Sequence, residues 1–238
     1  MLNDLLVLGV IPARAGSKGV PGKNIKKLNN KPLIYYSIKE AQKSKHITHL
    51  VVSTDSKEIQ KVSIKYGAEC PFLRPKELST DSALAVPTIQ HSLNYMENIK
   101  EIKYDYIIML QPTSPLRRCI DIDNSIEKLI QSDADGIISV VDVNNYHPMK
   151  MKMFLGSDKK SGKMVDYEKP PVENCPRQEL PPVFIVNGAI YATKRDVFQE
   201  KNSFQGENCI GYIMDADRSI NIDTEIEFTI AEKLMKES

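Results

Sequence analysis

The first 142 residues alternate short apolar runs with segments of helical periodicity, and this alternation restricts the possible folds more than any other feature. Each apolar run is long enough for one buried strand, and each helical segment repeats its apolar residues every three or four positions. Strands that alternate with helices are typical of a mostly parallel sheet covered by helices on both faces. We therefore predict an α/β fold. The expected strands are 5–11, 50–55, 106–110 and 136–141, and the expected helices begin near 32 or lie around 59–66, 89–96 and 122–130.

Between residues 144 and 182 the regular pattern is interrupted. This region has few apolar runs, a lysine-rich tract around 159–163 and prolines clustered between 170 and 182. Two interpretations stay open, a disordered linker and an extended arm or small subdomain ordered by a partner subunit. The regular pattern returns at 183–192, and a last helix is expected to carry Ile226 to Met235. We expect a single domain, 1–238, in which 144–182 is an insertion.

The first expected strand leads into a glycine-rich loop that carries Arg14, Lys18 and Lys23. Glycines let the backbone bend sharply and approach a ligand closely, and a strand, such a loop and then a helix form an anion site at the edge of an α/β sheet. The loop is not a P-loop, because five residues separate Gly16 from Gly22 and Asn24 stands where a hydroxyl is required. A dinucleotide fingerprint is also absent. We expect the loop to bind a nucleoside triphosphate, and the alternative is a cation-rich surface turn.

Polar side chains follow three of the expected strands. Arg14 follows the first strand, Ser53-Thr54-Asp55 end the second, and Gln111 follows the third. Ligands of open α/β sheets bind in the crevice outside the carboxyl ends of the strands. The spacing along the sequence therefore predicts one convergent site.

Near the C-terminus, Asn221 and Asp223 alternate with apolar residues. In an extended segment both side chains face the same side, so Asp223 is a candidate ligand for a magnesium ion that bridges phosphates. A second interpretation is that Asp223 or Thr224 caps the last helix. The spacing does not decide between them.

Composition excludes several classes of function. The formal net charge is +1, which gives no global attraction to nucleic acid or to a membrane surface. No apolar run approaches the roughly 20 residues that span a bilayer, and the N-terminus lacks the basic region and cleavage site of a signal peptide. Four widely spaced cysteines show no zinc or redox spacing and indicate reduced thiols and a cytoplasmic protein. No nucleophile elbow or Ser-His-Asp order appears, so cations and a metal that position a triphosphate are the chemistry that the sequence supports.

The motifs together resemble the acylneuraminate cytidylyltransferases, or CMP-sialic acid synthetases, in the right order through nearly the whole chain. The resemblance rests on Ile11-Pro12-Ala13-Arg14-Ala15-Gly16-Ser17-Lys18-Gly19, Lys23-Asn24, Val52-Ser53-Thr54-Asp55, Leu73-Arg74-Pro75, Leu110-Gln111-Pro112-Thr113-Ser114-Pro115-Leu116-Arg117, Pro176-Arg177-Gln178, Asn187-Gly188-Ala189-Ile190-Tyr191 and Ile222-Asp223-Thr224-Glu225. It implies a nucleotide-diphospho-sugar transferase sheet of Rossmann-like, three-layer type, and a homodimer whose 144–182 arm makes the dimer contact. It implies that CMP passes from CTP to the anomeric hydroxyl of a nonulosonic acid, with magnesium (Mg²⁺) as cofactor.

The resemblance also implies roles for individual residues. The catalytic residues would be Arg14, Lys23 and Asp223, and the nucleotide would be bound by Arg14, Ser17, Lys18, Asn24, Arg74 and Ser82. The sugar acid would be bound by Gln111, Lys150, Arg177, Asn187 and Tyr191, with Arg177 facing its carboxylate. The metal would be held by Asp223 and Asn221. From residue type alone, Lys150 and Arg177 also read as solvated loop cations, and His147 reads as structural.

One position departs from the family's pattern, which usually has Asp-Ile-Asp where this chain has Asn221-Ile222-Asp223. Asparagine binds a hard cation through its carbonyl oxygen but adds no charge. The departure has two interpretations. Either this chain binds magnesium more weakly, or it belongs to a subgroup that uses a relative of sialic acid such as legionaminic or pseudaminic acid. Two other functions stay open, activation of the eight-carbon sugar acid of lipopolysaccharide and nucleotide binding by a regulatory protein without catalysis.

Overall fold

The computed structural model describes residues 4–17, 19–80, 83–156 and 162–237. Its contacts divide the chain into a larger unit, Met1–Val140 with Val186–Ser238, and a smaller unit, Val141–Ile185. The arm expected at 144–182 lies within the smaller unit.

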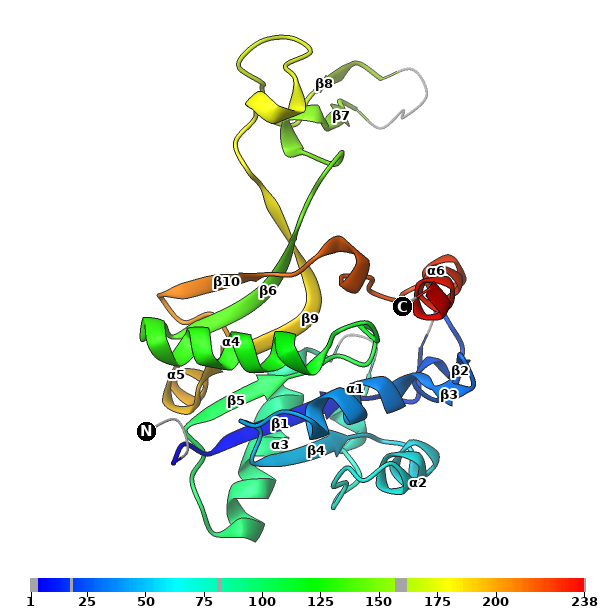
Figure 1. Ribbon diagram of the computed structural model, residues 1–238, viewed down its shortest axis with the longest axis vertical. Helices are drawn as coiled ribbons and strands as arrows, with labels where there is room; N and C mark the ends of the chain where they lie inside the picture. Colours follow the sequence, from blue (N-terminus) through cyan, green and yellow to red (C-terminus); the bar gives the residue numbers. More distant parts are fainter. Residues whose placement is uncertain (1–3, 18, 81–82, 157–161, 238) are drawn as a thin grey trace. The chain divides into compact units, whose positions relative to one another are not determined.

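A six-stranded sheet forms the centre of the larger unit (Figure 1). The strand order is β10-β6-β9-β5-β1-β4; β1 pairs in parallel with β4 and β5, β6 pairs in parallel with β10, and β5 pairs antiparallel with β9. This mostly parallel sheet confirms the predicted fold class. The strands are β1 (Val7–Pro12), β4 (His49–Ser53), β5 (Tyr106–Met109), β6 (Gly136–Asp142), β9 (Phe184–Lys194) and β10 (Cys209–Ile213).

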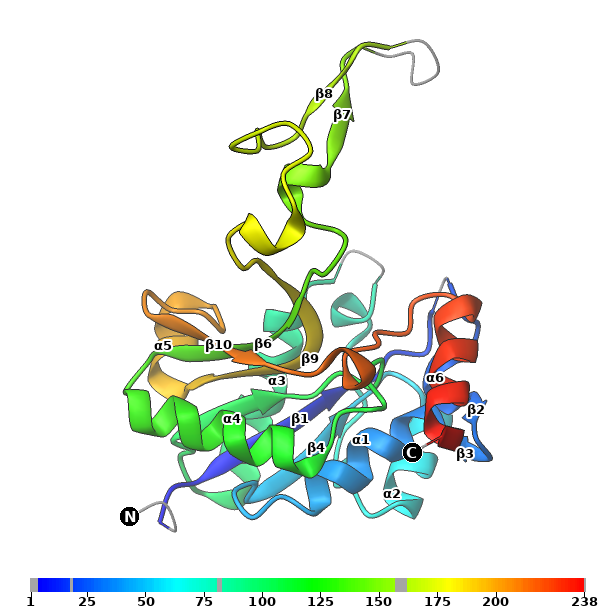
Figure 2. The same cartoon turned by 45° about the horizontal axis from the view of Figure 1, so that its top comes forward.

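Helices cover both faces of the sheet, as Figures 1 and 2 show. Successive strand residues point to opposite faces, and because these residues are apolar on both faces, each face needs a helical cover. Val7 and Ile11 of β1 pack with α1, α2 and α4, whereas Leu8 and Val10 pack with α3 and α5. The helices are α1 (Leu33–Gln42), α2 (Lys57–Lys65), α3 (Ala85–Lys100), α4 (Cys119–Ser132), α5 (Arg195–Lys201) and α6 (Glu225–Glu237).

A third apolar cluster joins the two ends of the chain. Val20 of the glycine-rich loop and Ile222 of the C-terminal segment are both fully buried in it, together with Leu33 of α1 and Phe228 of α6. A short hairpin, β2 (Lys27–Leu28) and β3 (Lys31–Pro32), follows the loop. This cluster brings residues that are some 200 positions apart in the sequence to the same edge of the sheet.

The smaller unit contains the antiparallel hairpin β7 (Lys152–Phe154) and β8 (Met164–Asp166), and two short 3-10 turns. His147 is 4% exposed and joins two of its segments, since its Nε2 contacts the Pro181 carbonyl (3.0 Å) and its Nδ1 accepts from the Met149 N–H (3.1 Å). The described part of this region is therefore not an unstructured linker, and His147 has a structural role.

Candidate active site

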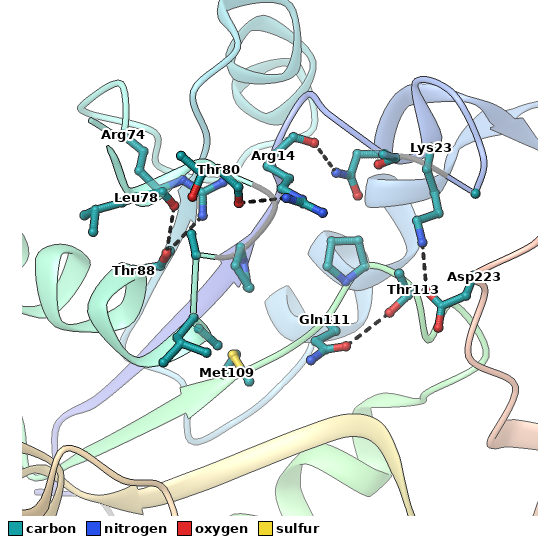
Figure 3. A pocket seen from close by; sticks show the side chains of 18 residues that line it. Arg14, Lys23, Arg74, Leu78, Thr80, Thr88, Met109, Gln111, Thr113 and Asp223 are labelled. Atoms are coloured by element: carbon teal, nitrogen blue, oxygen red, sulfur yellow. Dashed lines mark hydrogen bonds and ion pairs between the residues drawn. The ribbon is translucent and has the colours of Figure 1, made fainter. Parts of the chain in front are cut away.

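A pocket of about 430 Å³ opens at the carboxyl ends of β1 and β5. Figure 3 shows Arg14 and Arg74 on one side of this pocket, Lys23 and Asp223 on the other, and Gln111 between them. Three cationic side chains thus share the pocket with a single carboxylate among the lining residues that the structure describes. The residues predicted from the sequence that line it are Arg14, Ser17, Lys23, Asn24, Arg74, Gln111 and Asp223.

The glycine-rich loop is held in place by hydrogen bonds at both ends. The Ala15 N–H donates to Asp55 Oδ1 (2.9 Å), and the buried Asn24 donates from Nδ2 to the Arg14 carbonyl (2.9 Å). Asn24 and Asp55 therefore support the loop that carries Arg14. Arg14 itself donates from Nη1 to the Thr80 carbonyl (2.8 Å).

The loop contacts the C-terminal segment directly. An ideal Cβ placed on Gly19 would lie 2.0 Å from the Asp223 carbonyl oxygen, so no other residue fits there without a shift of backbone. Lys23, whose side chain is 12% exposed, donates to the Ile222 carbonyl (2.7 Å) and to Asp223 Oδ1 (3.0 Å). Lys23 of the loop and Asp223, the predicted metal ligand, therefore form an ion pair.

The structure separates the two roles that the sequence left open for Asp223 and Thr224. The N–H groups of Asp223 and Thr224 both donate to Glu227 Oε2 (2.7 Å each), so the acid of the first helical turn caps α6. The Asp223 carboxylate takes no part in the cap, because it accepts from Lys23 and from Asn221 Nδ2 (2.8 Å). Asp223 therefore faces the pocket.

Arg74 is 6% exposed and has fewer partners than such burial normally requires. Its Nη1 donates to Thr88 Oγ1 (3.2 Å), while Nε and Nη2 have no hydrogen-bond partner among the described residues. Burial, with a smaller contribution from the positive charge of Arg14, lowers its pKa from the usual arginine value, against the opposing effect of Asp55. These two buried donors line the pocket and are suited to acceptor atoms of a ligand.

Asn187 and Tyr191, two predicted residues of the larger unit, do not line this pocket. Asn187 is buried, and its amide bonds internally: Oδ1 accepts from Ser139 Oγ (2.6 Å), and Nδ2 donates to Ser219 Oγ (3.0 Å). Tyr191 of β9 packs with the cluster on the α3 face, and burial raises the pKa of its hydroxyl. Their contact with a sugar acid stays a prediction, and the structure shows that Asn187 supports the segment leading to Asn221.

Lys150 and Arg177 belong to the smaller unit, where Arg177 donates from Nη2 to Asp142 Oδ1 (3.1 Å) and Asn144 Oδ1 (2.9 Å). Lys18 and Ser82, which the resemblance implies as nucleotide contacts, lie outside the described residues.

Several lining residues had no predicted role. Thr88 receives the Arg74 hydrogen bond from α3, and Thr113 donates to Gln111 Oε1 (3.3 Å) and accepts at its carbonyl from the Ile222 N–H (2.8 Å). Thr113 belongs to the family motif 110–117, from which a role at the site could have been predicted. Thr88 lies on the amphipathic helix α3, and no motif marks it.

The donors near Asp223 fit a magnesium ion. Asn221 Oδ1 is buried and accepts no hydrogen bond from the described residues, and amide and carboxylate oxygens are ligands that Mg²⁺ accepts. Across the described residues no cluster of three or more His, Cys, Asp or Glu side chains could hold a metal alone. Such a site would take its remaining ligands from water and substrate phosphates, as is usual for Mg²⁺.

The fold and the pocket together are typical of α/β enzymes that bind nucleotides at the carboxyl edge of the sheet, where three cationic side chains lie in this chain. The chain belongs to the cytidylyltransferase family, whose model matches residues 8–203. This confirms the resemblance and the assignment as a nucleotidyltransferase.

Comparison with characterised proteins agrees. The chain is 36% identical over 232 residues to the post-translational flagellin modification protein B of Campylobacter coli, covering 97% of this chain and 95% of that protein. It is 35% identical over 239 residues to the CMP-N,N'-diacetyllegionaminic acid synthase of Legionella pneumophila, covering 97% and 96%. A CMP:2-keto-3-deoxy-manno-octonic acid synthetase solved with CTP has the same fold, with a TM-score of 0.70, 18% identity, and coverage of 97% and 98%.

Proposed function

We propose that this protein transfers CMP from CTP to the anomeric hydroxyl of a nine-carbon 2-keto sugar acid and releases pyrophosphate. The observation that carries the proposal is the pocket, in which Arg14, Lys23 and Arg74 converge beside Asp223. Several cations are needed to bind a triphosphate. Membership of the cytidylyltransferase family supports a cytidine nucleotide as the donor. The name of the Legionella relative supports a nonulosonic acid such as legionaminic acid or another relative of sialic acid as the acceptor.

The proposed reaction needs no covalent intermediate with the protein. The hydroxyl oxygen attacks the α-phosphorus, the bond from that phosphorus to the pyrophosphate oxygen breaks, and the hydroxyl proton is released. Arg14, Ser17 and Lys23 contact the phosphates. Arg74 donates to the nucleotide from Nε and Nη2. Asn24 contributes to nucleotide binding by holding the loop in place through its bond to the Arg14 carbonyl. Fixed cations in a partly buried pocket stabilise the charge that develops on the leaving group.

Magnesium is the proposed cofactor, held by Asp223 and Asn221, and when bound it neutralises phosphate charge. Gln111, Lys150, Arg177, Asn187 and Tyr191 are the proposed sugar-acid residues. The planar guanidinium of Arg177, which donates from Nη2 to Asp142 and Asn144, is suited to a carboxylate.

We propose a homodimer in which the smaller unit makes the contact. It exposes several large apolar side chains, including Phe154 (50%), Tyr167 (60%) and Val172 (58%), which a second copy would cover. The cytoplasm is the proposed location, because CTP is an intracellular substrate and the four cysteines are free. Among the described helices, none is long and apolar enough to cross a membrane.

The test is an incubation of the full chain with Mg²⁺, each of the four nucleoside triphosphates and a panel of keto sugar acids, with pyrophosphate as the readout. Release with CTP and a nine-carbon acid is the expected result. Release only with the eight-carbon acid would assign the lipopolysaccharide sugar instead. Tight CTP binding without release from any pair would indicate a non-catalytic nucleotide-binding protein.

Asn221→Asp is expected to make the stability of the protein depend on magnesium. The substitution replaces the amide donor to Asp223 by a second carboxylate, so without metal the free energy of unfolding should fall by about 1 kcal/mol. Added Mg²⁺ should restore the melting temperature, because a cation then sits between two acids. Thermal unfolding in EDTA and in Mg²⁺ measures both effects.

Asn221→Ala is the matched control, since it removes the same donor without adding charge. Mg²⁺ should raise its melting temperature no more than that of the wild type. An equal response to Mg²⁺ in all three proteins would exclude position 221 from the metal site.

A further inference from the structure

Arg117 is a fully buried arginine that the proposed chemistry does not use. Its side chain is 1% exposed, and none of the described carboxylates forms an ion pair with it. Burial lowers its pKa to about 10, although Asp121 and Glu40 act in the opposite direction. A well-packed apolar residue would avoid this desolvation penalty, so burial alone gives no reason for arginine at this position.

The hydrogen bonds of Arg117 all go to neutral oxygens. Nη1 donates to the Gln111 carbonyl (3.2 Å) and the Ala189 carbonyl (2.7 Å), and Nη2 donates to Ser37 Oγ (2.7 Å). Ser37 Oγ in turn donates to the same Gln111 carbonyl (3.3 Å). One planar guanidinium thus joins the end of β5, the strand β9 and the helix α1, which a flexible ammonium cannot do with the same geometry.

Of the two carbonyls that Arg117 joins, one belongs to a residue that lines the pocket and the other to β9, the strand paired with β5. Gln111 lines the pocket, and Ala189 follows Gly188, which has a φ of +77°. An ideal Cβ on Gly188 would lie 3.3 Å from Gln111 Oε1, so the Gln111 carboxamide lies against the backbone next to Ala189. A change in the spacing of these two strands would therefore move the Gln111 side chain.

We propose that Arg117 is a positioning residue for the acceptor side of the pocket, which it serves by fixing the backbone at Gln111 and Ala189. This inference rests on the proposed function only in assigning Gln111 to the sugar acid. The placement of the Gln111 carboxamide by Arg117 is a separate claim and has its own measurement.

The kinetic test is a double-mutant cycle of Arg117→Lys and Gln111→Ala. Arg117→Lys should lower kcat/KM for the sugar acid by about 10- to 100-fold, because a small displacement of a positioning group has effects of this size. Its Kd for CTP, measured without sugar acid, should change less than about threefold. In the Gln111→Ala background the effect of Arg117→Lys should largely disappear. Additive losses, or an equal loss of CTP affinity, would overturn the proposal.

A second measurement does not depend on activity. NMR spectra of the ¹⁵N-labelled protein show the side-chain amide signals of Gln111, which are assigned by their absence in Gln111→Leu. These signals should shift in Arg117→Lys. Unchanged signals would refute the positioning role even if no sugar acid is turned over. If Arg117→Lys does not fold, Ser37→Ala replaces it in both experiments, since it removes the other side-chain donor to the same carbonyl. Unaltered Gln111 signals and sugar-acid kinetics in Ser37→Ala would then contradict the proposal.

Discussion

Replacing Lys23 with methionine is expected to lower kcat/KM by about 10²- to 10³-fold, the size of effect seen when one preorganised charge-stabilising donor is removed. Lys23 is largely buried, lines the pocket and neutralises Asp223 at 3.0 Å. Without it, the Asp223 carboxylate faces the incoming triphosphate uncompensated, so both binding and turnover should suffer. Initial rates at varied CTP and fixed Mg²⁺ measure the effect.

Lys26→Met is the matched control for Lys23→Met. Lys26 follows the same loop and pairs with an acid of the same C-terminal segment, Glu225, but does not line the pocket. It also lies over the Phe228 ring, so its loss should reduce stability slightly and leave kcat/KM within about threefold of wild type. Equal kinetic losses in both variants would show that Lys23 acts only by holding the loop to the C-terminal segment.

Arg74→Met is expected to weaken CTP binding by about 10- to 100-fold without destabilising the free protein. Hydrogen bonds from a charged donor contribute about 1.5–3 kcal/mol, and two buried nitrogens of Arg74 have no partner in the part of the chain that the structure describes. Removing an uncompensated buried cation should leave the melting temperature unchanged or raise it by a few degrees. Titration calorimetry with CTP and thermal unfolding give the two values.

The control for Arg74→Met is Arg195→Met, at an arginine whose partners are complete. Arg195 bonds both oxygens of Glu97, Nε to Oε1 at 3.1 Å and Nη2 to Oε2 at 3.0 Å, and lies outside the pocket. Its loss should lower the melting temperature and leave CTP affinity unchanged. If Arg74→Met instead lowers stability with normal CTP affinity, Arg74 is structural.

The sequence predicted the fold class and the edge of the sheet that carries the site. Strand and helix periodicities are local properties, and in a parallel sheet the residues that follow the strands meet at one edge, so Arg14 and Gln111 could be placed together. The expectation was less accurate for Ser53-Thr54-Asp55. Ser53 and Thr54 are fully buried, and Asp55 supports the loop through the Ala15 N–H rather than lining the pocket.

The sequence also left undecided how polar side chains are used. From the sequence, metal binding by Asp223 and helix capping by Asp223 or Thr224 had equal weight, and only the positions of Glu227 and Lys23 show that the Asp223 carboxylate is not used in the cap. Asn187 stays a predicted contact of the sugar acid, and only the structure shows that its amide bonds Ser139 and Ser219. Hydrogen-bond partners of this kind depend on contacts that no local pattern encodes.

The sequence by itself therefore determined the α/β class, the family motifs and the cationic loop, because each depends on residues close together in the chain. The tertiary structure alone decided which donors stay available for a ligand. The burial of Val20 with Ile222 brings Lys23 to Asp223 across 200 positions. Among the described residues, Arg74 is left with two unpartnered nitrogens, whereas Arg117 bonds two backbone carbonyls and Ser37 and leaves only Nε without a partner. Burial and hydrogen bonding between distant segments distinguish these three cations, which are chemically similar in the sequence.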